Sequence, residues 1–205
     1  MGLTADHIRH GMDSLAALDQ RVAVALARAG YPEPRINARG AATLMRTIIG
    51  QQVSVKAAAS IWTRFEAAVG GFDDLHRILE VPVETLRGAG LSGQKATYVR
   101  SLAEAVVSGA LDFDNLPEDD EEAIKALVAV KGIGRWSAEI YLLFAEGRKD
   151  IWPAGDLAVQ VQLGRILGLE GKPSEKLTRE LVEHLRPHRG ALAIFMWHDY
   201  QIVVI

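Results

Sequence analysis

Apolar residues along this chain recur mainly at steps of three and four positions. Trp136, Ile140 and Leu143, for example, fall on one face of a helix at this step. Strict two-residue alternation is scarce, and only the terminal run Ile202–Ile205 suggests a strand. The pattern therefore predicts an all-α fold.

Caps and glycines set the expected helix limits, because a cap side chain accepts the first free N–H groups and glycine readily adopts the terminal left-handed conformation. We expect Asp13, Asn37 and Ser54 to be N-caps of helices that end at glycines. The expected helices are Asp13–Gly30, Asn37–Gly50, Ser54–Gly70, Asp73–Glu80, Pro82–Arg87, Ser92–Gly109, Pro117–Val130, Arg135–Glu146, Asp156–Leu167, Ser174–Arg186 and Gly190–Val203. Connections are short, and no Pro/Ser-rich linker or internal repeat divides the 205 residues.

Composition excludes several classes of protein. Hydrophobic residues make up 49% and charged residues 24%, which argues against a disordered tail or a fibre. No apolar run approaches the ~20 residues of a membrane span, and the polar start of the chain lacks the apolar stretch of a signal peptide. Cysteine is absent, which excludes disulfides, thiol catalysis, Cys-ligated zinc and iron–sulfur clusters. We therefore expect a cytoplasmic protein without a membrane partner.

The net charge of −3 argues against a nucleic-acid binder, but the charges are segregated. The stretch from residue 34 to 65 has five basic residues and no acidic one, and residues 85–103 and 123–138 add three basic residues each. Seven acidic residues and no basic one lie between positions 112 and 122. Such segregation can attract a polyanion despite the neutral total. The alternative is that these charges are ordinary solvated helix faces.

Residues Leu127–Ala145 predict two helices joined by a turn that contains Gly132, Ile133 and Gly134. Two glycines one residue apart allow a tight turn with exposed N–H groups, and the helix that starts there adds its dipole. This arrangement suits one phosphate group. The alternative is a turn that serves helix packing only.

A second signal follows about 20 residues later, where Pro153 and Gly155 shape a loop that places Asp156 at a helix start. By itself such an Asp is an N-cap. Together, however, Gly-Ile-Gly-Arg-Trp, a helix and Pro-x-Gly-Asp resemble the helix-hairpin-helix DNA glycosylases with the Gly/Pro–Asp signature (HhH-GPD), and within them the 3-methyladenine DNA glycosylase II (alkylbase) type. Further segments similar to this family are Ile48–Ser54, Gly90–Ala96 and Leu185–Gly190 with Trp197.

The resemblance covers roughly residues 35 to 200 and implies one module over residues 1–205 with two helical lobes. Lobe A would be 36–148, with the hairpin 127–145, and lobe B would be 1–35 plus 149–205, with the active site in the interlobe cleft. A separate N-terminal β-rich domain, found in one branch, has no room here, so we expect the compact form. The implied partner is double-stranded DNA with damaged bases, bound by a monomer that is nucleoid-associated if its source is bacterial.

The implied reaction of base excision repair is hydrolysis of the N-glycosidic bond of a flipped alkylated base, which leaves an abasic site. Asp156 would stabilise the oxocarbenium-like sugar, and a helix N-terminus favours its charged form. Glycosylases that also cut the strand carry a Schiff-base lysine where this chain has Trp136, so we expect a monofunctional enzyme. Two alternatives remain: a mismatch or deaminated-base glycosylase that uses the same Asp, and a non-catalytic DNA-binding module. A binding module needs the hairpin but no such carboxylate.

The resemblance also assigns the remaining site residues. Cationic alkylated purines attract aromatic faces, and the candidate base pocket is Trp136, Trp197 and Trp152, with core packing as the alternative for each. Ile140 and Leu157 replace aromatic residues of the better-known branch, which leaves the substrate preference open. The DNA intercalation loop would contain Gln51 and Gln52, and the phosphate grip would consist of Lys131, Gly132, Gly134 and Arg135. No cofactor is required, although a monovalent cation can bind the backbone carbonyls of Val128, Val130 and Ile133.

Overall fold

The fold is described from a computed structural model, which covers residues 2–204, with no account of the side chains of Val203 and Val204. This part of the chain is helical and contains no β-strand, as the sequence predicted. The suggested strand at the C-terminus is wrong for Ile202–Val204, which continue the last helix, and Ile205 lies outside the described residues. No helix in the described region is long and apolar enough to cross a membrane.

The chain forms two compact units, which we call unit 1 (Met1–Asn37 with Glu139–Ile205) and unit 2 (Ala38–Ala138). The expected boundary at residues 148/149 therefore falls ten residues too late. The reason is the segment after Glu139, whose contacts are with unit 1. The ring of Phe144 lies 5.5 Å from that of Trp197, and the Phe144 carbonyl accepts a hydrogen bond from the Asn37 N–H at 2.9 Å.

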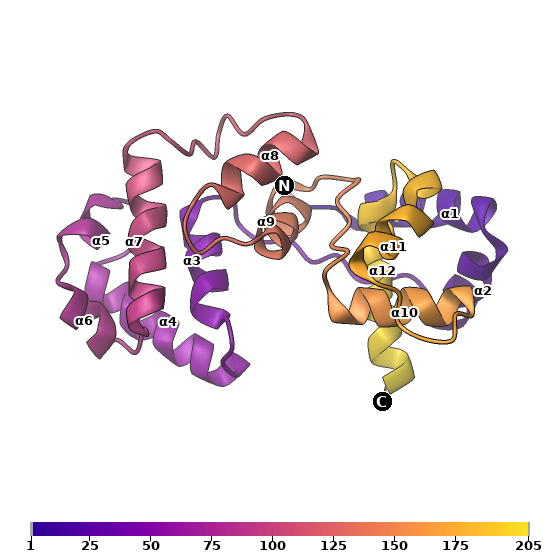
Figure 1. Cartoon of the computed structure of the whole chain (residues 1–205), viewed down its shortest axis with the longest axis horizontal. Coiled ribbons are helices and arrows are strands. Elements are labelled where there is room, and N and C mark those ends of the chain that lie inside the picture. The colour runs from indigo at the N-terminus through magenta and orange to yellow at the C-terminus, as the bar shows by residue number, and fades with distance from the viewer. Residues whose placement is uncertain (1, 205) are drawn as a thin grey trace. The chain divides into compact units, whose positions relative to one another are not determined.

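Unit 2 is organised around one central helix, α7, which packs against α3, α5 and α6 (Figure 1). Its elements are α3 (Ala41–Gly50), α4 (Val55–Val69), α5 (His76–Glu80), α6 (Val83–Gly88), α7 (Gly93–Val107), α8 (Asp120–Val128) and the first turn of α9 (Arg135–Tyr141). The side chains of Met45, Phe65 and Leu102 are fully buried in its core. Burial of such apolar side chains is the main stabilising term of the unit.

Several basic residues of unit 2 bind carbonyl groups at helix ends. Arg100 of α7 donates to the carbonyls of Leu79 and Val81 at the end of α5, at 2.8 and 2.9 Å. Arg64 of α4 donates to the Ala89 carbonyl after α6, at 2.9 Å. The last carbonyls of a helix lack intrahelical partners, so a cation there is stabilising. Part of the segregated basic charge therefore serves to stabilise helix ends within unit 2.

Unit 1 is built on the last helix, α12 (Figure 1). Residues Ala191–Met196 of this helix are all buried. It packs against α1, α2 and α10. The elements of unit 1 are α1 (Ala5–Leu18), α2 (Gln20–Ala29), the end of α9, the π-helical turn η1 (Leu142–Glu146), α10 (Leu157–Leu167), α11 (Glu175–Leu181), the 3-10 turn η2 (Glu183–Leu185) and α12 (Arg189–Val204). The carboxylate of Asp199 on α12 is buried and is paired with Arg28 at 2.6 Å.

The predicted helix starts are partly correct. Ser54 caps α4 as expected, through a bond from the Ala57 N–H. The prediction that Asp13 is an N-cap is wrong, because Asp13 lies inside α1. The single helix expected over residues 13–30 is broken at Asp19, which caps α2. Asn37 is also wrong, since α3 begins only at Ala41. The apolar step continues across these breaks, so periodicity alone could not locate them.

Candidate functional site

Unit 2 carries a groove of about 490 Å³ that brings together three segments far apart in the sequence. They are the loop after α3, the start of α7 and the turn between α8 and α9. The lining residues are Gln51, Gln52, Val53, Ser92, Gln94, Lys95, Tyr98, Gly132, Ile133 and Gly134. The predicted intercalation loop and the two hairpin glycines therefore face one common groove.

The hairpin turn is fitted closely against α7. Gly132 has φ +97°, and a Cβ atom on it would lie 2.2 Å from Cγ of Tyr98 and 2.6 Å from its Cβ. Only glycine is compatible with both the backbone angle and this approach. A Cβ atom added to Gly134 would meet nothing within 4 Å, so this position opens outward. Gly132 therefore allows the turn to pack against Tyr98, and Gly134 leaves the backbone of the turn accessible.

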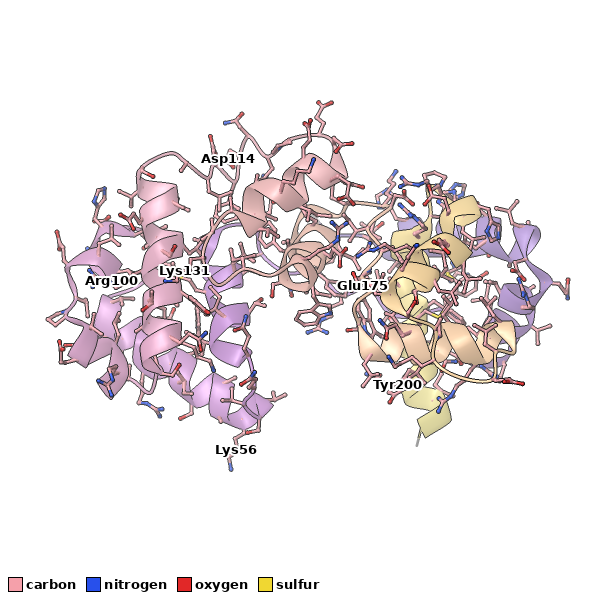
Figure 2. All side chains as sticks on the ribbon, viewed as in Figure 1. Lys56, Arg100, Asp114, Lys131, Glu175 and Tyr200 are labelled. Carbon is pink, nitrogen blue, oxygen red and sulfur yellow. The ribbon has the colours of Figure 1, made fainter. Side chains whose placement is uncertain are left out.

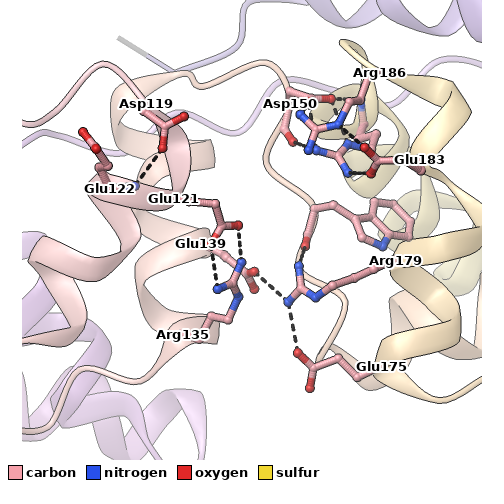
Figure 3. A network of polar contacts seen from close by, with 12 residues as sticks. Asp119, Glu121, Glu122, Arg135, Glu139, Asp150, Glu175, Arg179, Glu183 and Arg186 are labelled. Carbon is pink, nitrogen blue, oxygen red and sulfur yellow. Dashed lines mark hydrogen bonds and ion pairs between the residues drawn. The ribbon is translucent and has the colours of Figure 1, made fainter.

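The two basic residues beside the hairpin differ in their surroundings. Lys131 is exposed on the turn (Figure 2). Arg135, at the start of α9, forms a two-pronged ion pair with Glu121 of α8, with one N–O distance of 2.9 Å (Figure 3). A phosphate contact by Arg135 would compete with this ion pair. Lys131 is accordingly the better anchor for an anion.

The loop after α3 presents Gln52 with an unusual backbone. Gln52 is exposed, with φ +55°, in the left-handed region that non-glycine residues rarely adopt. Lys95 of α7 holds the preceding residues, since its ammonium donates to the carbonyls of Ile49 and Gln51 at 2.8 and 2.7 Å. Burial lowers the pKa of Lys95.

The expected cation ligands lie at the C-terminal end of α8 and in the following turn. Val128 ends the helix, and Val130 accepts a hydrogen bond from the Ile133 N–H at 3.1 Å, which leaves its second lone pair for another partner. Backbone carbonyls at a helix C-terminus are hard oxygen donors at its negative end, which suits a cation such as K⁺ or Na⁺. The described side chains contain no group of three or more His, Asp or Glu residues that could hold a metal ion.

Asp156 is the N-cap of α10 in unit 1, and its Oδ1 accepts the Val159 N–H at 3.1 Å. The same oxygen accepts the indole N–H of Trp197 from α12, also at 3.1 Å. Trp197 is half-buried, and its ring contacts that of Phe144. Two donors from different elements therefore fix the orientation of this half-buried carboxylate.

The loop before Asp156 is held from within unit 1. Gln160, one helical turn after Asp156, is buried; its amide donates to the Ala154 carbonyl at 2.6 Å and accepts from Lys172 at 2.9 Å. Trp152 was expected at the rim of the base pocket, but it is only 2% exposed. Its indole N–H has no hydrogen-bond partner among the described residues. In this structure the Trp152 ring is buried within unit 1 and is not exposed for contact with a base.

Arg179 of α11 ties the same loop to neighbouring segments of unit 1 (Figure 3). Its guanidinium pairs with the buried carboxylate of Glu139 and with Glu175, both at 3.0 Å, and lies 3.4 Å from the Trp152 carbonyl. A buried carboxylate needs such a partner, because desolvation otherwise opposes its charge. The network therefore stabilises the backbone that leads to Asp156.

Trp136 lies on the first turn of α9 in unit 2 and is 43% exposed. An indole is a large apolar group, and burial is its usual state. The exposure of Trp136 argues against the alternative that it is a core residue.

Sequence reasoning missed two residues that organise these sites, Lys95 and Tyr98, which support the loop and the hairpin. It assigned Trp197 to the base pocket but did not predict that its indole donates to Asp156. For Lys95 and Tyr98 the chain offers only a weak signal, since both lie in the expected helix Ser92–Gly109 at positions three residues apart. The Trp197 bond joins residues 41 positions apart and has no local signature.

Comparison with known proteins gives a consistent result. Residues 45–187 match the profile of the HhH-GPD superfamily of base excision DNA repair proteins. The chain is 33% identical over 158 residues to DNA-3-methyladenine glycosylase 1 of Schizosaccharomyces pombe, which covers 75% of this chain and 69% of that protein. A solved 3-methyladenine DNA glycosylase of S. pombe in complex with abasic DNA is similar with a TM-score of 0.80 and 28% identity, over 96% of this chain and 97% of the other. A DNA-3-methyladenine glycosidase structure from Bacillus halodurans gives a TM-score of 0.87 and 30% identity, over 95% and 90%.

Proposed function

The chain belongs to the HhH-GPD superfamily of base excision DNA repair proteins, and we propose that it is a monofunctional DNA glycosylase that releases alkylated bases from duplex DNA. The observation that carries the proposal is the carboxylate of Asp156, held at a helix start by the Val159 amide and the Trp197 indole. A protein that only binds DNA needs no carboxylate fixed in this way. The names of the similar glycosylases support alkylated bases as the substrate class.

Asp156 would act on the sugar of the flipped nucleotide. The bond between C1′ and the base nitrogen breaks, and its electron pair leaves with the base. The developing positive charge on the sugar is stabilised by the nearby carboxylate. Water then forms the new C1′–O bond, and its proton passes to Asp156 and on to solvent. A cationic alkylpurine leaves as a neutral base, so it needs no general acid.

No strand cleavage is expected, because the site lacks a lysine at the position where a lyase carries one. A lyase reaction needs an amine that can form a Schiff base with the sugar. The corresponding position carries Trp136, and Lys131 lies on the other side of the glycines, on the exposed turn. The exposed ring of Trp136 suits a flipped cationic base, because the face of an indole attracts a cation.

Unit 2 would supply the grip on DNA. The N–H groups of the glycine turn and the ammonium of Lys131 suit one backbone phosphate, and Gln52 would fill the gap that the flipped base leaves. The carbonyls of Val128, Val130 and Ile133 would hold a monovalent cation that adds positive charge near this phosphate. Gln51 shapes the loop through its carbonyl, which accepts from Lys95.

The test is an assay of the purified protein on duplexes that contain methylated purines, an etheno adduct, or uracil or thymine in a mismatch. Released bases are separated by chromatography, and strand breaks are counted before and after alkali. The proposal predicts free methylated purines and breaks only after alkali. Release of mismatched pyrimidines alone would favour the mismatch-glycosylase alternative, and binding without any base release would favour a non-catalytic module.

A further inference from the structure

The loop that carries Gln52 is held by a half-buried lysine from another helix. Lys95 lies in the first turn of α7, and its ammonium reaches the carbonyls of Ile49 and Gln51 at 2.8 and 2.7 Å. Carbonyls in the last turn of a helix have no partner within that helix. One ammonium therefore satisfies the end of α3 and the first residue of the loop together, and its charge complements the negative end of the helix dipole.

The held conformation is one that the loop does not favour by itself. Gln51 has extended ψ of 130°, and Gln52 follows at φ +55°. A non-glycine residue at such a φ stores strain that the surrounding structure must offset. Gln52 is exposed, so its side chain is available for DNA. Its backbone is constrained through the preceding residue, whose carbonyl is bound by Lys95.

The contact also argues against Lys95 as a phosphate ligand. An ammonium has three N–H donors, and two of them are used within the protein. Lys95 is half-buried, and this burial lowers its pKa, which opposes the charge that a phosphate ligand needs. A lysine that grips phosphate is instead expected to be exposed, as Lys131 is.

We propose that Lys95 is a positioning residue for base flipping, whose ammonium holds the loop in the conformation from which Gln52 enters the duplex. The inference rests on the proposed function, because a side chain that fills a gap in the duplex is needed only where a base is extruded. When the loop that carries Gln52 is already ordered before DNA binds, less conformational entropy is lost on binding. Lys95 thus acts through Gln52 and touches no reacting atom.

The experiment compares affinity for a duplex that carries a tetrahydrofuran abasic analogue with affinity for the same duplex undamaged. Lys95→Met keeps the apolar stem and removes the ammonium. We expect it to lower the preference for the abasic duplex about tenfold, with affinity for undamaged DNA unchanged. Lys95→Arg, which can still donate to both carbonyls, should keep most of the preference. In a Gln52→Ala background, Lys95→Met should cause no further loss, because the two residues act as one unit.

Arg100 provides the matched control, since it binds two helix-end carbonyls from the same helix α7, but at the end of α5 and not in the loop after α3. Arg100→Met should lower the melting temperature and leave the preference intact. An equal loss of preference in Arg100→Met would overturn the proposal in favour of general destabilisation. A loss on both duplexes with a salt slope reduced by about 0.9 would overturn it in favour of a phosphate contact.

Lys95→Gln is measured as a second variant in case Lys95→Met does not fold. An unchanged preference of Lys95→Gln for the abasic duplex would then contradict the proposal. Measurements on the wild-type protein distinguish a failure of the positioning role of Lys95 from a failure of the proposed function. If it releases alkylated bases and prefers the abasic duplex while the Lys95 variants keep that preference, only the positioning role fails. If it releases no base at all, the proposed function fails with it.

Discussion

Replacement of Gly132 by alanine tests whether the hairpin depends on its close approach to α7. The new methyl group would lie 2.2 Å from Cγ of Tyr98 and 2.6 Å from its Cβ. The Cβ atom of Tyr98 is fixed by the helix backbone, so a change of side-chain rotamer cannot relieve the overlap. The turn must therefore move away from α7.

The magnitude follows from two costs. Alanine at φ +97° costs about 1–3 kcal/mol in backbone strain, and an added methyl group in a packed site costs about 1–3 kcal/mol more. The expected loss is about 2–6 kcal/mol in the free energy of unfolding, or roughly 5–20 °C in Tm for a chain of this size. DNA affinity should also fall, because the displaced turn no longer aims its N–H groups at the phosphate.

Gly134→Ala is the matched control two residues away, where nothing lies within 4 Å of the added carbon. Its unfolding free energy should stay within about 0.5 kcal/mol of wild type. Its DNA affinity should still fall, because the methyl group stands between the backbone and an approaching phosphate. Thermal melting and fluorescence anisotropy with labelled duplex measure both effects. A wild-type Tm for Gly132→Ala, or an equal loss in both variants, would refute the packing argument.

Three further outcomes are expected. Trp197→Phe keeps an aromatic ring but removes the N–H that binds Asp156, so single-turnover base release should fall about tenfold with DNA affinity unchanged; an unchanged rate would contradict this role. Lys131→Ala should flatten the salt dependence of binding by a slope of about 0.9, and Arg135→Ala by less, because Arg135 is paired with Glu121; equal changes would show that the ion pair opens on DNA. Borohydride should trap no covalent enzyme–DNA complex above background, and efficient trapping would reveal a lyase amine.

The sequence predicted those parts of the molecule that depend on local patterns. The all-α class follows from apolar spacing, and the caps Ser54 and Asp156 follow from side chains that bond within one turn. The errors also have local causes. Asp13 and Asn37 have the chemistry of caps, but α1 already begins at Ala5, where the Thr4 side chain accepts the His7 N–H, and α3 begins at Ala41 after Gly40.

The arrangement of the candidate sites depends on contacts between distant segments, which a single sequence does not encode in any pattern. Lys95 reaches carbonyls 44 and 46 residues away, and neither acceptor has a side-chain signature. Trp136 ends the hairpin motif and Trp152 directly precedes the Pro-x-Gly-Asp motif, yet Trp152 is buried and Trp136 is 43% exposed. Only the packing of each unit distinguishes a supporting indole from one that can stack on a ligand.

The role of Asp156 in catalysis is tested by the single-turnover rate of base release by Asp156→Asn. Asparagine keeps the size of the side chain and an oxygen that can accept the Val159 and Trp197 N–H groups, but it removes the negative charge. We expect the rate to fall by about 10²–10³-fold, while Tm and affinity for an abasic duplex stay close to wild type. Release of a methylated base by Asp156→Asn at a rate near that of wild type would contradict the role of Asp156.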